Sequence, residues 1–165
     1  MWELLYGVPG FLYCFLELQS AYDNLEEELF RTKFAPISMQ ITRDIIHQGV
    51  ATYEELYKTK LNMVGELPET FRLMYLFHKK EYLGGAHGLA GNINILLLSF
   101  KLNNFGAELD SYCKLISKSI MFLLRHLING NFSTSANSQR IKLVHFCHGA
   151  PGFVSALSRF FNMFP

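Results

Sequence analysis

The segment Ile141-Lys142-Leu143-Val144-His145-Phe146-Cys147-His148-Gly149-Ala150-Pro151-Gly152-Phe153 places a thiol and two imidazoles directly before two glycines. Cysteine thiolate and histidine nitrogen are the usual zinc ligands, and they also form nucleophile and base pairs. Glycine permits tight turns, and proline suits the first turn of a helix. The residues that follow have helical spacing, so we expect Cys147 and His148 on a turn at a helix N-terminus. A single cysteine is also a common buried apolar residue, so this segment alone leaves structural burial open.

Two further segments repeat the order of a turn, a Gly-x-x-Gly motif and an apolar helix. They are Tyr6-Gly7-Val8-Pro9-Gly10-Phe11 and Tyr82-Leu83-Gly84-Gly85-Ala86-His87-Gly88-Leu89-Ala90-Gly91. His87 stands directly before its first glycine, as His148 does. Between consecutive copies there is room for a second helix, which indicates helical hairpins that stack on their neighbours. The pattern predicts one all-α domain over residues 1–165, with turns that meet on one side and repeats that start near Gly7, Gly88 and Gly149.

Apolar periodicity predicts helices over residues 11–21, 93–100 and 108–127. Another helix is expected to begin near Pro36 and to end at Gly49, because glycine commonly follows a helix C-terminus. Residues 53–68 show no clear periodicity, which favours an exposed insertion. Cys14 and Cys113 fall in or beside apolar stripes, so we expect both to be packed in the core.

Composition limits the function classes. The formal net charge of +1 argues against nucleic-acid binding. Half of the residues are hydrophobic and only 18% are charged, so the chain has either extensive burial or a partner that covers apolar surface. The sequence has no apolar run long enough for a transmembrane helix and no recognisable signal peptide. Three widely spaced cysteines do not make a disulfide framework, which favours a reducing, intracellular compartment.

The three motifs together resemble the lanthionine synthetase C-like family, and most closely its animal cytosolic branch. The most specific stretches are 82–91 and 143–152. The resemblance implies a toroid of α/α hairpins, six or seven in a complete ring, of which this chain would form a part. It also implies a cytoplasmic protein that can associate peripherally with the plasma membrane.

The resemblance further implies one zinc ion held by two cysteines and one histidine. Cys147 matches the first of these cysteines, and we expect the other two ligands beyond Pro165. His87 matches the histidine proposed as acid or base, and His148 lines the same cavity by analogy. The implied reaction is addition of glutathione to dehydroalanine or dehydrobutyrine residues in proteins, and we expect this chain alone to be inactive.

Two alternatives stay open. The first is an adaptor of the same family that binds glutathione or a protein partner without catalysis. The second is a different α/α toroid that acts on glycosides, which would need paired acidic residues at the cavity mouth. The turns carry Tyr6, His87 and His148 instead, so this alternative ranks last.

Overall fold

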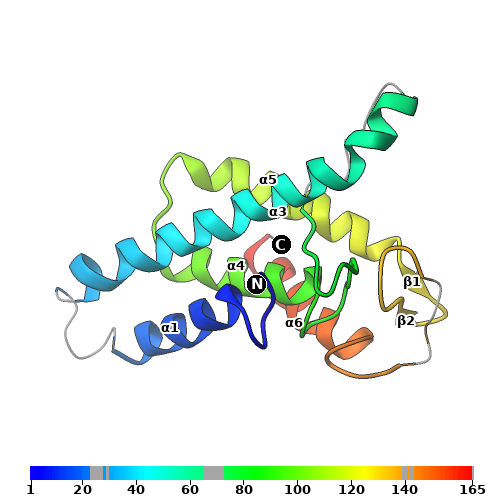
Figure 1. The fold of residues 1–165 in the computed structure, drawn as a ribbon. Helices are drawn as coiled ribbons and strands as arrows, with labels where there is room; N and C mark the ends of the chain where they lie inside the picture. The colour runs from blue at the N-terminus through cyan, green and yellow to red at the C-terminus, as the bar shows by residue number, and fades with distance from the viewer. Residues whose placement is uncertain (23–27, 29, 65–72, 139–140, 142, 165) are drawn as a thin grey trace.

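The computed structural model describes residues 1–165 apart from 23–27, 29, 65–72, 139–140, 142 and 165 (Figure 1). The helices are α1 (Val8–Tyr22), the short π-helix η1 (Phe30–Phe34), α3 (Ala35–Val64), α4 (Leu89–Leu102), α5 (Glu108–Leu124) and α6 (Ala150–Met163). Two strands of two residues each, β1 (Leu127–Ile128) and β2 (Asn131–Phe132), form an antiparallel hairpin. The predicted all-α class is confirmed.

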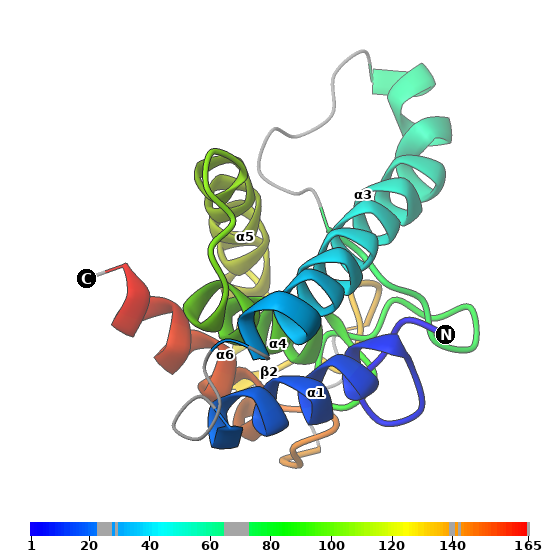
Figure 2. The same cartoon turned by 90° about the vertical axis from the view of Figure 1, so that its left-hand side faces the viewer.

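The helices form two layers (Figure 2). α1, α4 and α6 lie side by side in one layer, and α3 and α5 cover it from the other side. α4 is central, because it packs against all four of the other long helices and is buried along almost its whole length. A helix that is apolar on every side is stable only when neighbours surround it. The two layers are those of a partial α/α toroid, with α1, α4 and α6 as inner helices.

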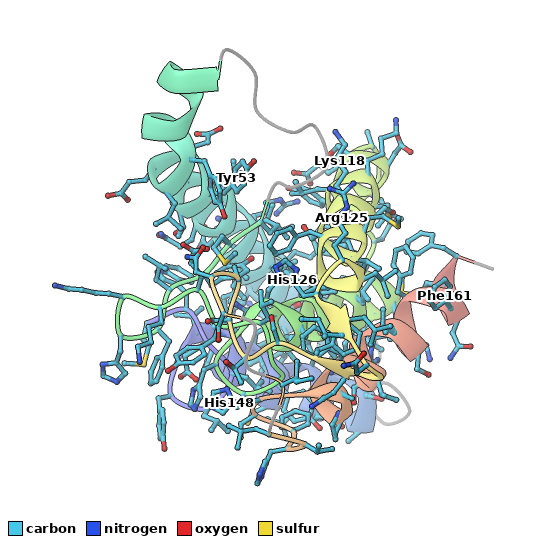
Figure 3. All side chains as sticks on the ribbon, turned by 90° about the vertical axis from the view of Figure 1, so that its right-hand side faces the viewer. Tyr53, Lys118, Arg125, His126, His148 and Phe161 are labelled. Atoms are coloured by element: carbon cyan, nitrogen blue, oxygen red, sulfur yellow. The ribbon has the colours of Figure 1, made fainter. Side chains whose placement is uncertain are left out.

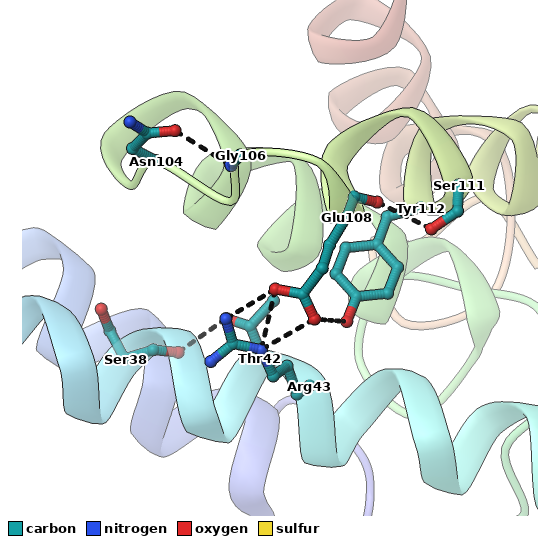
Figure 4. Close-up of polar contacts among 8 residues, drawn as sticks. All are labelled: Ser38, Thr42, Arg43, Asn104, Gly106, Glu108, Ser111 and Tyr112. Atoms are coloured by element: carbon teal, nitrogen blue, oxygen red, sulfur yellow. Dashed lines mark hydrogen bonds and ion pairs between the residues drawn. The ribbon is translucent and has the colours of Figure 1, made fainter.

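The outer helices are joined by an ion pair that crosses between them (Figure 4). The Arg43 guanidinium of α3 donates to both carboxylate oxygens of Glu108 at the start of α5, with an Nη2–Oε2 distance of 2.6 Å. Tyr112 donates its hydroxyl to the same carboxylate at 2.9 Å. The guanidinium and the phenol together hold the pKa of Glu108 below its usual value. Because these groups are partly exposed to water, the pair fixes orientation more than it adds stability.

α3 corrects two predictions from the sequence. Gly49 does not end the helix, which continues to Val64, and Tyr53 is buried rather than part of an exposed insertion. The extended segment at residues 73–75 lies against α3 at this point, where the Met74 amide donates to the Gly49 carbonyl at 3.0 Å. A side chain at position 49 would overlap the Tyr75 ring. Gly49 therefore permits close approach of another segment and is not a helix stop.

Cys14 is also placed differently from the prediction, since its side chain is exposed. α1 packs through Leu12 and Leu16, which are fully buried against α3 and α4. Cys14 lies between these two in sequence, so it points to the other side of the helix together with the exposed Phe11 and Leu18. Cys113 is half-buried on α5. Among the described residues, no helix has the length and apolar composition that crossing a membrane requires.

The predicted apolar stripe of α5 is confirmed. Ile116 and Ile120 are buried, and Leu109, Tyr112 and Leu124 pack against the core. The helix ends at Leu124 rather than Leu127. Asn129 and Gly130 both have positive φ and turn the chain into the β1–β2 hairpin. This hairpin reaches the inner layer, where the Phe132 ring stacks on the Phe153 ring of α6 at a centroid distance of 3.9 Å.

The Gly-x-x-Gly motifs have a shared physical cause. At the second glycine of each motif, an added Cβ would overlap the carbonyl oxygen of the residue six positions earlier, well inside the 3.0 Å that real Cβ atoms keep. The pairs are Gly10 with Leu4, Gly91 with Gly85, and Gly152 with Phe146. Each turn therefore folds back onto the helix that it opens, and only a hydrogen atom fits between them.

We expect Gly91→Ala to lower the free energy of unfolding by about 1–3 kcal/mol, because the backbone of the turn must move away. Gly106→Asn is the matched control. Gly106 has a φ of 53° with open space around it, and asparagine tolerates that conformation. Urea unfolding followed by circular dichroism measures both. Equal stability of the Gly91→Ala variant and the parent chain would contradict this account of the motif.

Candidate functional site

The three turns that open the inner helices are hydrogen-bonded to one another. We call residues 1–7, 82–88 and 143–149 the turn cluster. Leu4 donates its amide to the Ala86 carbonyl at 3.0 Å, and Gly85 donates its amide to the Phe146 carbonyl at 3.0 Å. The turns of α1 and α6 thus meet on either side of the turn of α4. The predicted convergence of the three turns is confirmed.

His87 lies between aromatic rings in this cluster. Its imidazole stacks on Phe77 with a centroid distance of 4.4 Å and an interplanar angle of 6°, and it lies 6.2 Å from the Tyr6 ring. Its Nδ1 atom is 2.8 Å from a carboxylate oxygen of Glu3. Because an ionised carboxylate only accepts hydrogen bonds, Nδ1 carries the proton and Nε2 is the atom free for chemistry. The ring is fixed in position, with Nδ1 held by Glu3 and Nε2 left for proton exchange.

Glu3 is the partner that the sequence analysis missed. It is fully buried, and its carboxylate also accepts the backbone amides of Leu5 and Tyr6. A buried carboxylate is stable only when hydrogen bonds or a positive charge replace its water. Glu3 therefore closes the first turn and orients His87 in the second. The only feature of the sequence that could have indicated this role is that Glu3 is the single acidic residue in the apolar segment 1–6, and such a feature is weak.

His148 faces His87 across the cluster, with ring centroids 6.1 Å apart. Its ring is 5.1 Å from the Tyr82 ring, and its Nδ1 atom is buried without a hydrogen-bond partner in the described part of the chain. Desolvation lowers the pKa of His148 below its usual value of 6.5, and positive charge on His87 and His145 lowers it further. At neutral pH the ring is therefore neutral and able to accept a proton.

Cys147 precedes His148 in the same turn and is half-buried. Gly84 lies against the Cys147 carbonyl so closely that a side chain there would overlap it. The structure thus brings the turn of His87 directly against the turn of Cys147. Among the described residues, no group of three His, Cys, Asp or Glu side chains could hold a metal ion. A catalytic zinc takes three protein ligands, so these residues do not form a complete zinc site.

Asn131 holds the third turn in place from outside it. Its Nδ2 donates to the Ile141 carbonyl at 2.7 Å and to the Leu143 carbonyl at 3.1 Å. Its Oδ1 accepts the Ala150 amide at 2.8 Å, which satisfies one of the free amides at the start of α6. Asn131 comes from β2, so the sequence pattern around Cys147 gave no indication of it.

A hollow of about 570 Å3 opens next to His148. Its lining includes Lys80 and three residues with hydroxyl groups, Thr134, Ser135 and Ser138. Tyr82 also lines this hollow. Figure 3 shows His148 at the end of the molecule opposite Lys118 of α5. A small anionic ligand in this hollow would lie against the neutral imidazole.

The fold and this cluster define a class of protein: a partial α/α toroid whose inner helices begin at a shared centre that holds the Cys147 thiol, the facing imidazoles of His87 and His148, and the buried Glu3 carboxylate. The family model described as lanthionine synthetase C-like protein matches residues 2–165. The chain belongs to that family, as the motifs predicted.

One curated relative is "Glutathione S-transferase LANCL1" of Danio rerio. It is 28% identical over 163 residues, which are 98% of this chain and 36% of the relative. The chain thus spans about a third of the length of that relative.

The pKa of His148 gives a test of the site geometry. We expect its ring protons to titrate below pH 6.5 in an NMR titration, because burial disfavours the charged form. His87→Asn should raise this pKa part of the way, since it removes one nearby positive charge but leaves the burial. The His47→Asn variant, exposed on α3, should leave the pKa unchanged. A normal His148 pKa in the parent chain would contradict the buried position of the ring.

Metal content gives a second test. We expect the 165-residue polypeptide to hold less than one equivalent of zinc after dialysis, because one thiolate and neighbouring imidazoles fall short of three ligands. Atomic absorption measures the content, and Cys147→Ser serves as the reference for non-specific zinc. One tightly held equivalent that disappears in Cys147→Ser would show that the chain completes a site by itself.

Proposed function

We propose that this chain carries the acid–base part of a thiol transferase, which adds glutathione to dehydroalanine or dehydrobutyrine residues in proteins. The observation that carries the proposal is the pair of imidazoles 6.1 Å apart, one oriented by a buried carboxylate and the other neutral. Addition of a thiol to an alkene needs one group that accepts a proton and one that donates it. The two rings have environments suited to these two tasks.

The proposed reaction forms one C–S bond and one C–H bond. The thiol S–H proton passes to neutral His148, and the sulfur forms a bond to the β-carbon of the dehydroamino acid. The π electrons of the alkene move onto the α-carbon and its carbonyl as an enolate. His87, protonated and held by Glu3 through Nδ1, donates its Nε2 proton to the α-carbon. The product is a thioether, and no other reactant is consumed.

Family membership and the relative's printed name support glutathione as the thiol. Within the proposal, Cys147 is one ligand of a zinc ion, and the other ligands lie outside the described residues. A cytoplasmic location, where thiols stay reduced, belongs to the same proposal. Peripheral association with the plasma membrane remains a prediction of the resemblance.

A second candidate is a non-catalytic adaptor that binds glutathione or a protein partner. The observation that favours it is the lack, among the described residues, of any group of three metal-binding side chains. The two functions differ in one measurable respect, because an adaptor binds glutathione without forming a thioether. The experiment below separates them.

We expect His87→Asn to lower the rate of thioether formation on the order of 10²–10⁴-fold, the usual effect of losing a general acid. The assay uses a chimera in which this chain replaces the matching third of the zebrafish relative. Glutathione and a dehydroalanine peptide are the substrates, and mass spectrometry follows the product. Glu3→Gln should cause a smaller loss, because the ring stays but its orientation weakens.

His47→Asn is the matched control, since that histidine lies exposed on the outer helix α3. Thermal melting of each chimera excludes loss of folding as the cause. Full activity of a folded His87→Asn chimera would remove His87 from the mechanism. A parent chimera that binds glutathione but forms no thioether would favour the adaptor.

A further inference from the structure

A groove runs along the inner layer beside the turn cluster, and none of its lining residues lines the His148 hollow. It has a volume of about 760 Å3, within the range of sites for small ligands. Its walls come from α1, α4, α6 and the turn before α1. Most of the wall is apolar and includes Phe11, Ile95 and Phe146. A few polar groups interrupt it, as in sites that orient a mainly apolar ligand.

Arg159 of α6 is the cation of this groove. The Nε atom of Arg159 donates a hydrogen bond to Oδ1 of Asn94 on α4 at 3.0 Å, which holds the guanidinium in place. In the described part of the chain, no carboxylate forms an ion pair with Arg159. Its two terminal NH2 groups keep the fork geometry that binds a carboxylate with two parallel hydrogen bonds.

Among the described residues that line the groove, the charged side chain is the cation Arg159. Among the described residues, no Asp or Glu lines it, and none lines the adjoining hollow of about 580 Å3 between α4 and α6, which Arg159 and Lys101 both line. Glu17 of α1 is an acid that acts on Tyr13, one of the residues that line the groove. Glu17 raises the pKa of Tyr13 above its usual value, and Arg159 opposes that shift. The groove therefore offers positive charge beside apolar surface.

The groove also ends at the turn cluster. Leu4 and Phe146 line it, and these residues make the hydrogen bonds that join the three turns. Phe146 directly precedes Cys147 in the chain. A ligand that extends from Arg159 toward Phe146 would present its far end to the cluster of His87 and His148.

We propose that this groove binds the acceptor peptide, as an extended segment with apolar side chains and one acidic side chain whose carboxylate pairs with Arg159. This inference rests on the proposed function, because that function supplies the peptide. Glutathione suits the other hollow better, since hydroxyl groups and Lys80 line that one while the groove is mainly apolar. Arg159 is thus a specificity residue that favours dehydroamino acids close to an acidic residue.

The test uses the 165-residue chain and two dansyl-labelled pentapeptide amides. One peptide has a central glutamate between apolar residues, and the other has glutamine in its place. Fluorescence anisotropy measures both affinities. We expect the parent chain to bind the glutamate peptide about tenfold more tightly, as one charge-assisted pair allows. Arg159→Met should bind both peptides alike, and Arg159→Lys should keep part of the preference.

Lys118→Gln is the control for net charge, because Lys118 lies on α5 in the outer layer (Figure 3). It should keep the full preference. Circular dichroism melting checks that each variant is folded. In the parent chain, bound glutamate peptide should also slow alkylation of the exposed Cys14, which lines the groove.

An unchanged preference in folded Arg159→Met, or no preference in the parent chain, would overturn the proposal. Displacement of the glutamate peptide by free glutathione, lost in Arg159→Met, would assign the groove to glutathione and overturn the acceptor assignment. The outcome is independent of turnover. His87→Asn should keep the peptide preference, so failure of the proposed chemistry and failure of the groove assignment give different results.

Discussion

The structure depends on close contact between the backbones of three turns. Leu4 bonds to Ala86, and Gly85 bonds to Phe146, so the starts of α1, α4 and α6 are tied together without a side chain between them. Such contact is possible only where the neighbouring positions lack a Cβ atom. The three residues that directly precede the first glycine of each motif are thereby brought close together. Tyr6, His87 and His148 meet there although they are far apart in the chain.

A buried carboxylate orients one of the histidines in this cluster of turns. Glu3 accepts two amides of its own turn and the Nδ1 proton of His87, so the hydrogen bonds that stabilise its charge also orient the imidazole. His148 has the opposite environment, since burial without a hydrogen bond at Nδ1 favours its neutral form. Two histidines in equivalent positions of a repeat thus have different surroundings: the Glu3 carboxylate contacts one ring, and the other has a buried Nδ1 atom without a hydrogen bond. Pairs of this kind are typical of acid–base centres.

The two hollows beside the turn cluster differ in chemistry. The one beside His148 has hydroxyl groups and Lys80, whereas the other is mainly apolar with Arg159 held by Asn94. Addition of a thiol to a peptide needs two substrates that approach one centre from different directions. In the function that we propose, the hollow beside His148 and the groove beside Arg159 would each receive one of these substrates.

The sequence by itself determined the apolar inner helices, the stripe of α5 and the glycine turns, because periodicity and the lack of a Cβ atom act locally. It also predicted that His87 and His148 share a site, since equivalent positions of a repeat become neighbours when the repeats stack. It did not reveal that Gly49 lies inside a helix, that Cys14 is exposed, or that Glu3 and Asn131 hold the site. Those outcomes were decided only by the tertiary structure. Gly49 meets Tyr75, and α1 presents Leu12 and Leu16 rather than Cys14 to the core. Glu3 reaches His87 from 84 positions away, and Asn131 bonds to residues 10 to 19 positions further along the chain.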